Sequence, residues 1–183
     1  MALTNSEMVP LGIDAPDFDL FDTNGKSYSL RDFKDTDILV LIFMCNHCPY
    51  VKSTLARLVN LQNEYSNKNV QLIGINPNDS NRYPEDSPEA MKKVIAENNI
   101  SFPYLIDSTQ KTARAYNAVC TPDIFVYGRE RTLLYRGRFD DNWKEPVLVE
   151  RQDLKIAIDL ILVGKDVFQN QIPSIGCSIK WKT

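Results

Sequence analysis

The stretch ILVLIFMCNHC, residues Ile38–Cys48, decides the fold, because an uninterrupted apolar run leads directly into two cysteines. The run predicts a buried strand over about residues 37–44. After it, apolar side chains recur at three- and four-residue spacing, which predicts an amphipathic helix over about residues 47–65. Cys45 is therefore expected at or near a helix N-terminus. Unpaired backbone N–H groups and the helix dipole there favour a thiolate, the nucleophile of disulfide exchange.

Composition limits the classes of protein to consider. With 183 residues, 43% of them hydrophobic, the chain is expected to form one domain, residues 1–183. A net charge of −3 and dispersed Lys and Arg residues argue against a nucleic-acid partner. Residues 1–10 show no basic segment followed by an apolar core, and no apolar run approaches the roughly 20 residues that span a bilayer. We therefore expect a cytoplasmic protein without a membrane partner.

Four cysteines are too few for a disulfide scaffold in a chain of this size. A Cys-x-x-Cys pair in an intracellular protein indicates either redox or metal chemistry. Cys45 and Cys48 are accordingly the first candidates for a functional site.

The rest of the chain alternates strand and helix signals. An Asn-Gly turn predicts an N-terminal hairpin, and a second apolar run over residues 70–75 completes a β-α-β unit. Ser87 followed by Pro88 is typical of a helix start. The other expected elements are a strand over 102–106, a helix ending at Tyr116, a hairpin over 123–135, a helix over about 150–163, and an irregular but packed tail over 165–183.

This order of elements resembles the thioredoxin fold over about residues 35–163. Ala15–Leu20, Asn24–Lys26 and an inserted unit near residues 76–107 are similar to the redoxin (AhpC/TSA) branch, which includes peroxiredoxin-like proteins and bacterial thiol-disulfide reductases. The strings CNHCPYV (45–51), CTPD (120–123) and CSIKW (177–181) resemble an uncharacterised peroxiredoxin-like group. The resemblance implies an α/β fold: a central mixed sheet flanked by helices, an N-terminal hairpin extension over 1–34, an inserted β-α unit and a C-terminal tail.

The same resemblance implies roles for individual residues. Cys45, as the more exposed thiol, would attack, and Cys48 would resolve the mixed disulfide. Pro122 would be a cis-proline facing the dithiol, and Thr121 would present backbone groups to an extended substrate. The implied activity is thiol-disulfide exchange, with a protein or small disulfide as substrate, a thiol as electron donor and no cofactor. The sequence leaves the particular substrate and the oligomeric state open.

His47 lies between the two cysteines. A cationic imidazole beside the sulfur is expected to lower the pKa of the thiolate-forming cysteine. A more stable reduced form makes the couple more oxidising, so we expect a potential above the roughly −270 mV of reducing thioredoxins. The alternative is an exposed residue of the first helical turn with no role.

Three further residues are candidates for accessory roles. Cys120 precedes the expected cis-proline by two residues and either packs in the core or lies near the site. Cys177 either folds back as a second resolving thiol or packs. Arg138, with Asp140 and Asp141, follows the last strand and belongs either to the rim of the site or to a solvated turn.

Other functions remain to be weighed against disulfide exchange. In a thiol peroxidase Cys48 would be the peroxidatic cysteine, but Leu41, Cys45 and Pro122 stand where peroxiredoxins keep a proline, a threonine and an arginine. A structural zinc site usually has four ligands, commonly in two closely spaced pairs. The sequence contains one such pair, Cys45 and Cys48, so no metal is expected. A non-catalytic redox sensor would differ from an enzyme only in turnover.

Overall fold

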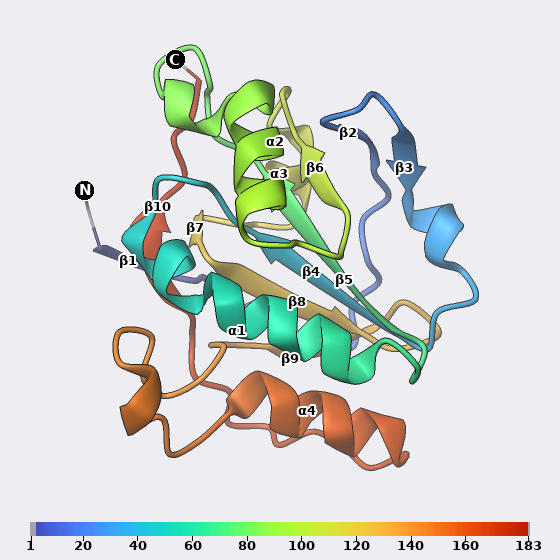
Figure 1. The fold of residues 1–183 in the computed structure, drawn as a ribbon. Coiled ribbons are helices and arrows are strands. Elements are labelled where there is room, and N and C mark those ends of the chain that lie inside the picture. The colour runs from blue at the N-terminus through green and yellow to red at the C-terminus, as the bar shows by residue number, and fades with distance from the viewer. Residues whose placement is uncertain (1–2, 183) are drawn as a thin grey trace.

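Figure 1 shows a computed structural model of the chain, in which residues 3–182 are described. Its elements alternate between strand and helix through most of the sequence. The helices are α1 (Pro49–Tyr65), α2 (Pro88–Glu97), α3 (Lys111–Ala115) and α4 (Asp153–Leu162), and the strands are β1 (Leu3–Asn5), β2 (Asp19–Asp22), β3 (Ser27–Ser29), β4 (Ile38–Phe43), β5 (Val70–Asn76), β6 (Tyr104–Ile106), β7 (Cys120–Thr121), β8 (Asp123–Tyr127), β9 (Leu133–Arg136) and β10 (Ile175–Ser178).

Seven strands form the central sheet, in the order β3-β2-β6-β5-β4-β8-β9. Strands β4, β5 and β6 are parallel, whereas β8 runs antiparallel to β4 and to β9, so the sheet is mixed. Strand β4 is buried along its whole length, as a strand covered on both faces requires. This is the α/β thioredoxin-like fold that the order of elements predicts.

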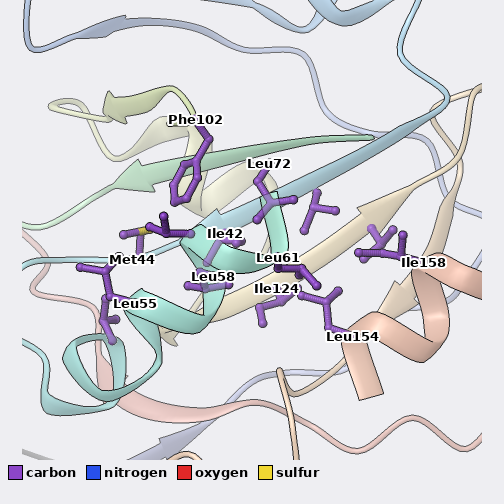
Figure 2. Close-up of a cluster of buried hydrophobic side chains, with 14 of the residues drawn as sticks. Ile42, Met44, Leu55, Leu58, Leu61, Leu72, Phe102, Ile124, Leu154 and Ile158 are labelled. Atoms are coloured by element: carbon purple, nitrogen blue, oxygen red, sulfur yellow. The ribbon is translucent and has the colours of Figure 1, made fainter. Parts of the chain in front are cut away.

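The two faces of β4 contribute to two separate hydrophobic clusters. Ile38, Val40 and Ile42 point toward α1 and α4, where Leu58, Leu154 and other apolar side chains complete the larger cluster (Figure 2). The alternate residues Leu39, Leu41 and Phe43 pack on the other face, against α3 and the segment before β3. Successive side chains of a strand point to opposite faces, so one apolar run supplies both clusters.

Several predicted elements are present with small differences at their ends. The β2-β3 hairpin has Gly25 at φ 82°, and the Asp22 carboxylate accepts hydrogen bonds from the backbone N–H groups of Asn24 and Lys26. Ser87 caps α2, as predicted, by accepting a hydrogen bond from the N–H of Ala90. The last helix begins at Asp153, a few residues later than expected, and a short 3-10 turn at Pro146–Leu148 comes before it.

A second, small sheet was not predicted. Strand β10 lies between β1 and β7, antiparallel to both, in the order β1-β10-β7. The tail expected to be irregular therefore contains a strand, and that strand pairs with the segment directly before Pro122. Within residues 3–182 no helix is long and apolar enough to cross a membrane.

Candidate active site

The two cysteines of the Cys-x-x-Cys pair occupy different positions at the start of α1. Cys48 is the N-cap residue, Pro49 is the first helical residue, and the Cys48 carbonyl accepts a hydrogen bond from the N–H of Lys52. Cys45 lies before the helix, two residues after β4 ends at Phe43. Cys45 was expected at or near the helix N-terminus; it lies three residues before the N-cap, and the N-cap itself is Cys48. The stabilisation that the first turn gives to an anion falls on Cys48.

Exposure does not distinguish the two thiols. Cys45 is 1% exposed and Cys48 is 0% exposed, so the expectation that Cys45 is clearly the more exposed thiol is wrong. Both cysteines belong to the larger hydrophobic cluster, whose side chains cover them. Attack on any substrate by either thiol requires a local opening of this region.

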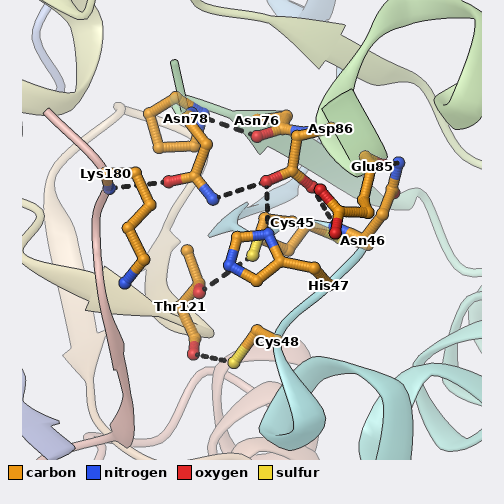
Figure 3. A network of polar contacts seen from close by, with 12 residues as sticks. Cys45, Asn46, His47, Cys48, Asn76, Asn78, Glu85, Asp86, Thr121 and Lys180 are labelled. Carbon is orange, nitrogen blue, oxygen red and sulfur yellow. Dashed lines mark hydrogen bonds and ion pairs between the residues drawn. The ribbon is translucent and has the colours of Figure 1, made fainter. Parts of the chain in front are cut away.

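The Thr121-Pro122 peptide bond is cis, as the resemblance implied, and Thr121 contacts both sulfurs (Figure 3). The Oγ1 atom of Thr121 lies 3.3 Å from the Sγ atom of Cys45. In its protonated form the Cys48 thiol donates a hydrogen bond to the Thr121 carbonyl oxygen across 3.0 Å. Thr121 therefore holds the two thiols on one side of the cis bond, at the junction of β7 and β8.

A buried carboxylate organises the other side of the dithiol. Asp86 accepts a hydrogen bond from the backbone N–H of Asn46 and another from the side-chain amide of Asn78, each 2.7 Å long. The oxygen that accepts from Asn78, Oδ2, also lies 2.7 Å from Nδ1 of His47 (Figure 3). The His47 ring stacks on the ring of Tyr83. Asp86 thus fixes the backbone between the two cysteines together with the histidine side chain.

Sequence reasoning missed Asp86. It falls in the polar stretch 76–86, where several acidic residues look alike, and it is buried only because the 3-10 turn Pro84–Asp86 folds against residues 46–47. No periodicity in the sequence marks this contact. The structure supplies the buried acid that could not be selected from composition.

The electrostatic surroundings separate the two thiols. The hydrogen bond from Cys45 lowers the pKa of Cys48 most, and contacts with Cys177, the Val51 N–H and Thr121 add to this against the opposing effect of burial, which leaves it at about 5. The same hydrogen bond, burial and the Asp86 carboxylate raise the pKa of Cys45 well above its usual value. One negative charge is thus shared by a coupled pair, and it resides mainly on Cys48.

The role expected for His47 is narrowed by this arrangement. Nδ1 of the ring is directed at Asp86, and the pKa of Cys45 is raised, not lowered. At Cys48 the N-cap position and the neighbouring S–H groups favour the thiolate, and a further contribution from His47 stays a prediction. His47 also ties Asp86 to the segment between the two cysteines.

The accessory candidates lie at different distances from this chemistry. The Cys120 thiol donates to the Pro122 carbonyl oxygen across 3.6 Å, and burial raises its pKa. Cys177 forms a hydrogen bond with Cys48.

Arg138 donates a hydrogen bond to Asp153 across 2.5 Å and, with Pro122, Asp140 and Asp141, lines a cavity of about 310 Å³. A second cavity, of about 480 Å³, adjoins Cys45 on the side of α2.

One cluster has the composition of a metal site. Cys45, His47 and Asp86 each offer a ligand atom, and these atoms lie within 4.8 Å of one another. Three protein ligands are the number found in catalytic zinc sites. However, the Asp86 carboxylate already accepts hydrogen bonds from Asn46 and Asn78 and contacts His47, so the residues fit a hydrogen-bonded network better than a metal site.

A buried dithiol beside a cis-proline, on a thioredoxin-like fold, defines a thiol-based redox protein. Residues 11–136 match the model of the AhpC/TSA family, and the chain belongs to this family. An uncharacterised conserved protein from Geobacillus kaustophilus has a similar solved structure, with 46% identity, a TM-score of 0.95 and coverage of 100% of this chain and 97% of that one.

Two curated relatives are more distant and differ in their described activity. The thiol-disulfide oxidoreductase ResA of Bacillus thuringiensis subsp. konkukian is 24% identical over 69% of each chain. A candidate peroxiredoxin of Helicobacter pylori, bcp, is 25% identical over 73% of this chain and 81% of its own. The relatives therefore include a thiol-disulfide oxidoreductase and a candidate peroxiredoxin, and the choice between these two activities depends on the geometry of the site.

Replacing Asp86 with asparagine is expected to lower the free energy of unfolding by about 1–3 kcal/mol, because buried donors at Asn46, His47 and Asn78 lose part of their acceptor. Burial raises the pKa of Asp86, but the bonds from His47, Asn78 and Asn46 outweigh it and lower the pKa overall. The stabilisation is therefore present above the unfolded pKa of about 3.9 and is lost as pH falls toward the folded value.

Urea unfolding of the wild type and of Asp86→Asn, at pH 7 and at acidic pH, measures this difference. Glu85→Gln is the matched control, because the Glu85 side chain is exposed and the hydrogen bond from the Asn46 side chain goes to the Glu85 backbone carbonyl oxygen, which the substitution keeps. Equal stabilities of Asp86→Asn and Glu85→Gln at pH 7 would show that Asp86 does not hold the site together.

Proposed function

We propose that the protein is a thiol-disulfide oxidoreductase in which Cys45 and Cys48 alternate between a dithiol and a disulfide. The observation that carries this proposal is that one residue, Thr121, contacts the sulfurs of both cysteines beside the cis-proline. A low-pKa thiolate at a helix N-cap, Cys48, lies against a second thiol, Cys45, and both contact Thr121. Two thiols in contact are the minimum needed to accept one two-electron oxidation as a disulfide.

The reaction follows from the charge distribution. The Cys48 thiolate attacks one sulfur of a substrate disulfide, the substrate S–S bond breaks, and one substrate thiolate leaves with the electron pair. Cys45 then loses its proton and attacks the Cys48 sulfur, which releases the second substrate thiolate and leaves a Cys45–Cys48 disulfide. The substrate is reduced and the dithiol is oxidised. A thiol electron donor then reduces the Cys45–Cys48 disulfide back to the dithiol and is itself oxidised to a disulfide.

The low pKa of Cys48 also supports Cys48 as the attacking cysteine, in place of Cys45, which the resemblance had implied. The lowered pKa of Cys48 favours its thiolate at neutral pH, whereas the raised pKa of Cys45 favours the protonated thiol. Since the two thiols are almost equally buried, the cysteine with the larger thiolate fraction is expected to react first. The cavity of about 480 Å³ is lined by Cys45 and not by Cys48, so a small disulfide or a protein disulfide would reach Cys48 only after the local opening described above.

A thiol peroxidase is the second candidate, and one observation favours it. The thiolate resides on Cys48, the position that corresponds to the peroxidatic cysteine in the resemblance to peroxiredoxins. In that reaction the Cys48 thiolate attacks one oxygen of hydrogen peroxide, the O–O bond breaks, and the departing hydroxide takes up a proton and leaves as water. Cys45 then attacks the sulfur of the Cys48 sulfenic acid, the S–O bond breaks, and a second water leaves as the same disulfide forms. The two activities thus share an oxidised product and differ in the oxidant.

The midpoint potential of the Cys45–Cys48 couple is expected to lie above about −270 mV, because stabilisation of the Cys48 thiolate stabilises the reduced form. Redox titration in glutathione or dithiothreitol buffers measures it, with Cys120→Ser as the control that leaves both site thiols in place. Turnover is then measured with a protein disulfide, with oxidised glutathione and with hydrogen peroxide.

Disulfide turnover with a midpoint above that value supports the proposal. Fast reaction with hydrogen peroxide and no turnover of either disulfide would assign the peroxidase instead. Oxidation without turnover of any of the three would leave a redox sensor.

A further inference from the structure

We propose that Cys177 is a second redox partner of Cys48, so that the site holds a three-thiol relay, Cys45, Cys48 and Cys177. This inference rests on the proposed disulfide chemistry of Cys45 and Cys48. It adds a residue from the C-terminal strand, far from the dithiol in sequence, and it assigns Cys48 as the central sulfur.

The pairing of β10 with β7 places Cys177 on the same side as the dithiol. Cys177 is directly opposite Thr121 in the antiparallel register, and directly opposite residues of such a pair point to the same face. Thr121 uses that face to contact the Cys45 sulfur. Cys120, one residue earlier, faces the other way and bonds to the Pro122 carbonyl oxygen.

A direct hydrogen bond joins the Cys48 and Cys177 side chains, and both belong to one buried cluster. Cys48 therefore has a thiol neighbour on two sides, Cys45 from its own loop and Cys177 from β10. Cys177 is 2% exposed, so this contact is enclosed within the protein.

Gly176 is what lets β10 approach so closely. A Cβ atom at this position would lie 2.1 Å from the Thr121 carbonyl oxygen and 2.6 Å from its carbonyl carbon, and both are backbone atoms that cannot swing aside. Only glycine permits the approach. Gly176 thus allows Cys177, the next residue, to lie close to the Thr121-Pro122 peptide bond.

Strand β10 is also held along its length. The Ser6 and Ser174 residues exchange hydrogen bonds on one side, and the backbone N–H of Lys180 donates to the Asn78 side chain on the other. Asn78 in turn donates to Asp86, the residue that orders the dithiol loop. The position of Cys177 is therefore tied to the same network that positions Cys45 and Cys48.

This arrangement changes the role expected for Thr121. Its strand edge was expected to pair with an extended substrate, but β10 occupies that edge. An extended protein substrate could pair there only after β10 moves away. The chain places its own cysteine, Cys177, where a substrate strand would present one.

The relay step is an exchange within the protein and needs no added oxidant. Cys177 loses its proton and attacks the Cys48 sulfur of the Cys45–Cys48 disulfide. The Cys48–Cys177 bond forms, the Cys45–Cys48 bond breaks, and Cys45 takes the electron pair and a proton. Burial and the Cys48 thiolate hold the pKa of Cys177 at about 12 in the reduced protein, and oxidation of Cys48 removes the second of these causes.

Disulfide mapping of full-length variants tests the relay. Trypsin is expected to place Cys45 and Cys48 in peptide 35–52, Cys120 in 115–129 and Cys177 in 166–180, so each pairing gives a different product. In Cys45→Ser treated with oxidised dithiothreitol, peptides 35–52 and 166–180 are expected to become linked, and titratable thiols to fall from three to one. Adding Cys120→Ser should leave the link in place, and adding Cys177→Ser should abolish it.

Gly176→Ala is the second test, because it pushes Cys177 away without removing a thiol. In Cys45→Ser/Gly176→Ala the link is expected to be lost or strongly reduced, while Gly176→Ala alone still forms the Cys45–Cys48 bond. A Cys45→Ser protein that keeps all three thiols, or that links Cys48 to Cys120, would overturn the relay. A wild type that forms no Cys45–Cys48 bond, with the Cys48–Cys177 link intact, would overturn the proposed function instead.

Discussion

Cys48→Ser is expected to reduce the rate of the first reaction with a disulfide by about 1,000-fold or more, to the background level, because it removes the resident thiolate. Cys45→Ser is expected to keep a rapid first step and to stop at a mixed disulfide on Cys48. Stopped-flow release of thionitrobenzoate from the aromatic disulfide DTNB, under single-turnover conditions, measures both variants.

The pH dependence of this first step provides an independent check. The rate is expected to rise with pH through an apparent pKa near 5, since the reactive fraction of Cys48 is the thiolate. Cys120→Ser serves as the matched control, because it removes a buried thiol that faces away from Thr121. A rapid first step in Cys48→Ser that is absent from Cys45→Ser would reverse the assignment and make Cys45 the nucleophile.

Arg136→Met is expected to lower the free energy of unfolding by about 3–5 kcal/mol, the cost of breaking a fully buried ion pair. Arg136 and Asp123 both have side chains that are 0% exposed, and their two contacts include a 3.1 Å bond from Nη2 to Oδ2. Without Arg136 the Asp123 carboxylate is left buried and unpaired. Since Asp123 directly follows Pro122, the loss falls next to the active site.

Urea unfolding at pH 7 measures this effect against a matched pair at the surface. Arg129 and Asp37 form an ion pair whose side chains are 63% and 41% exposed, so Arg129→Met is expected to cost only about 0–1 kcal/mol. Asp123→Asn combined with Arg136→Met should recover part of the loss, because the charge is gone while an acceptor for the Val119 N–H remains. Equal costs for Arg136→Met and Arg129→Met would show that the buried pair contributes little.

The sequence was sufficient for the parts of the fold that depend on local pattern. The apolar run at β4, the helix start at Ser87 and the Asn-Gly hairpin each carry their own signal, and each is present. The cis bond at Pro122 followed from resemblance alone. Pro49 was a further usable signal, because proline favours the first helical position and so marks Cys48, not Cys45, as the N-cap.

Other parts of the site depend on contacts between distant residues and have no local signature. Asp86 is brought to His47 by the folding of a polar loop, and Cys177 is brought to Cys48 by a strand of four residues. Short strands that pair across the whole chain lack the alternating pattern that longer strands show. The position of the dithiol beside the cis-proline was therefore predictable from the sequence and its resemblance, whereas the opposite pKa shifts of Cys45 and Cys48 were not.

The β1-β10-β7 sheet has a consequence for how the site is reached. Its pairings join the N-terminal and C-terminal segments of the described chain, and such non-local contacts involve a large loss of chain entropy. Elements held by few such contacts tend to open locally while the main core stays folded. We expect access to the buried thiols to follow a local opening of this small sheet, so that the rate of reaction depends on local stability. Amide hydrogen exchange at β10 would measure that opening.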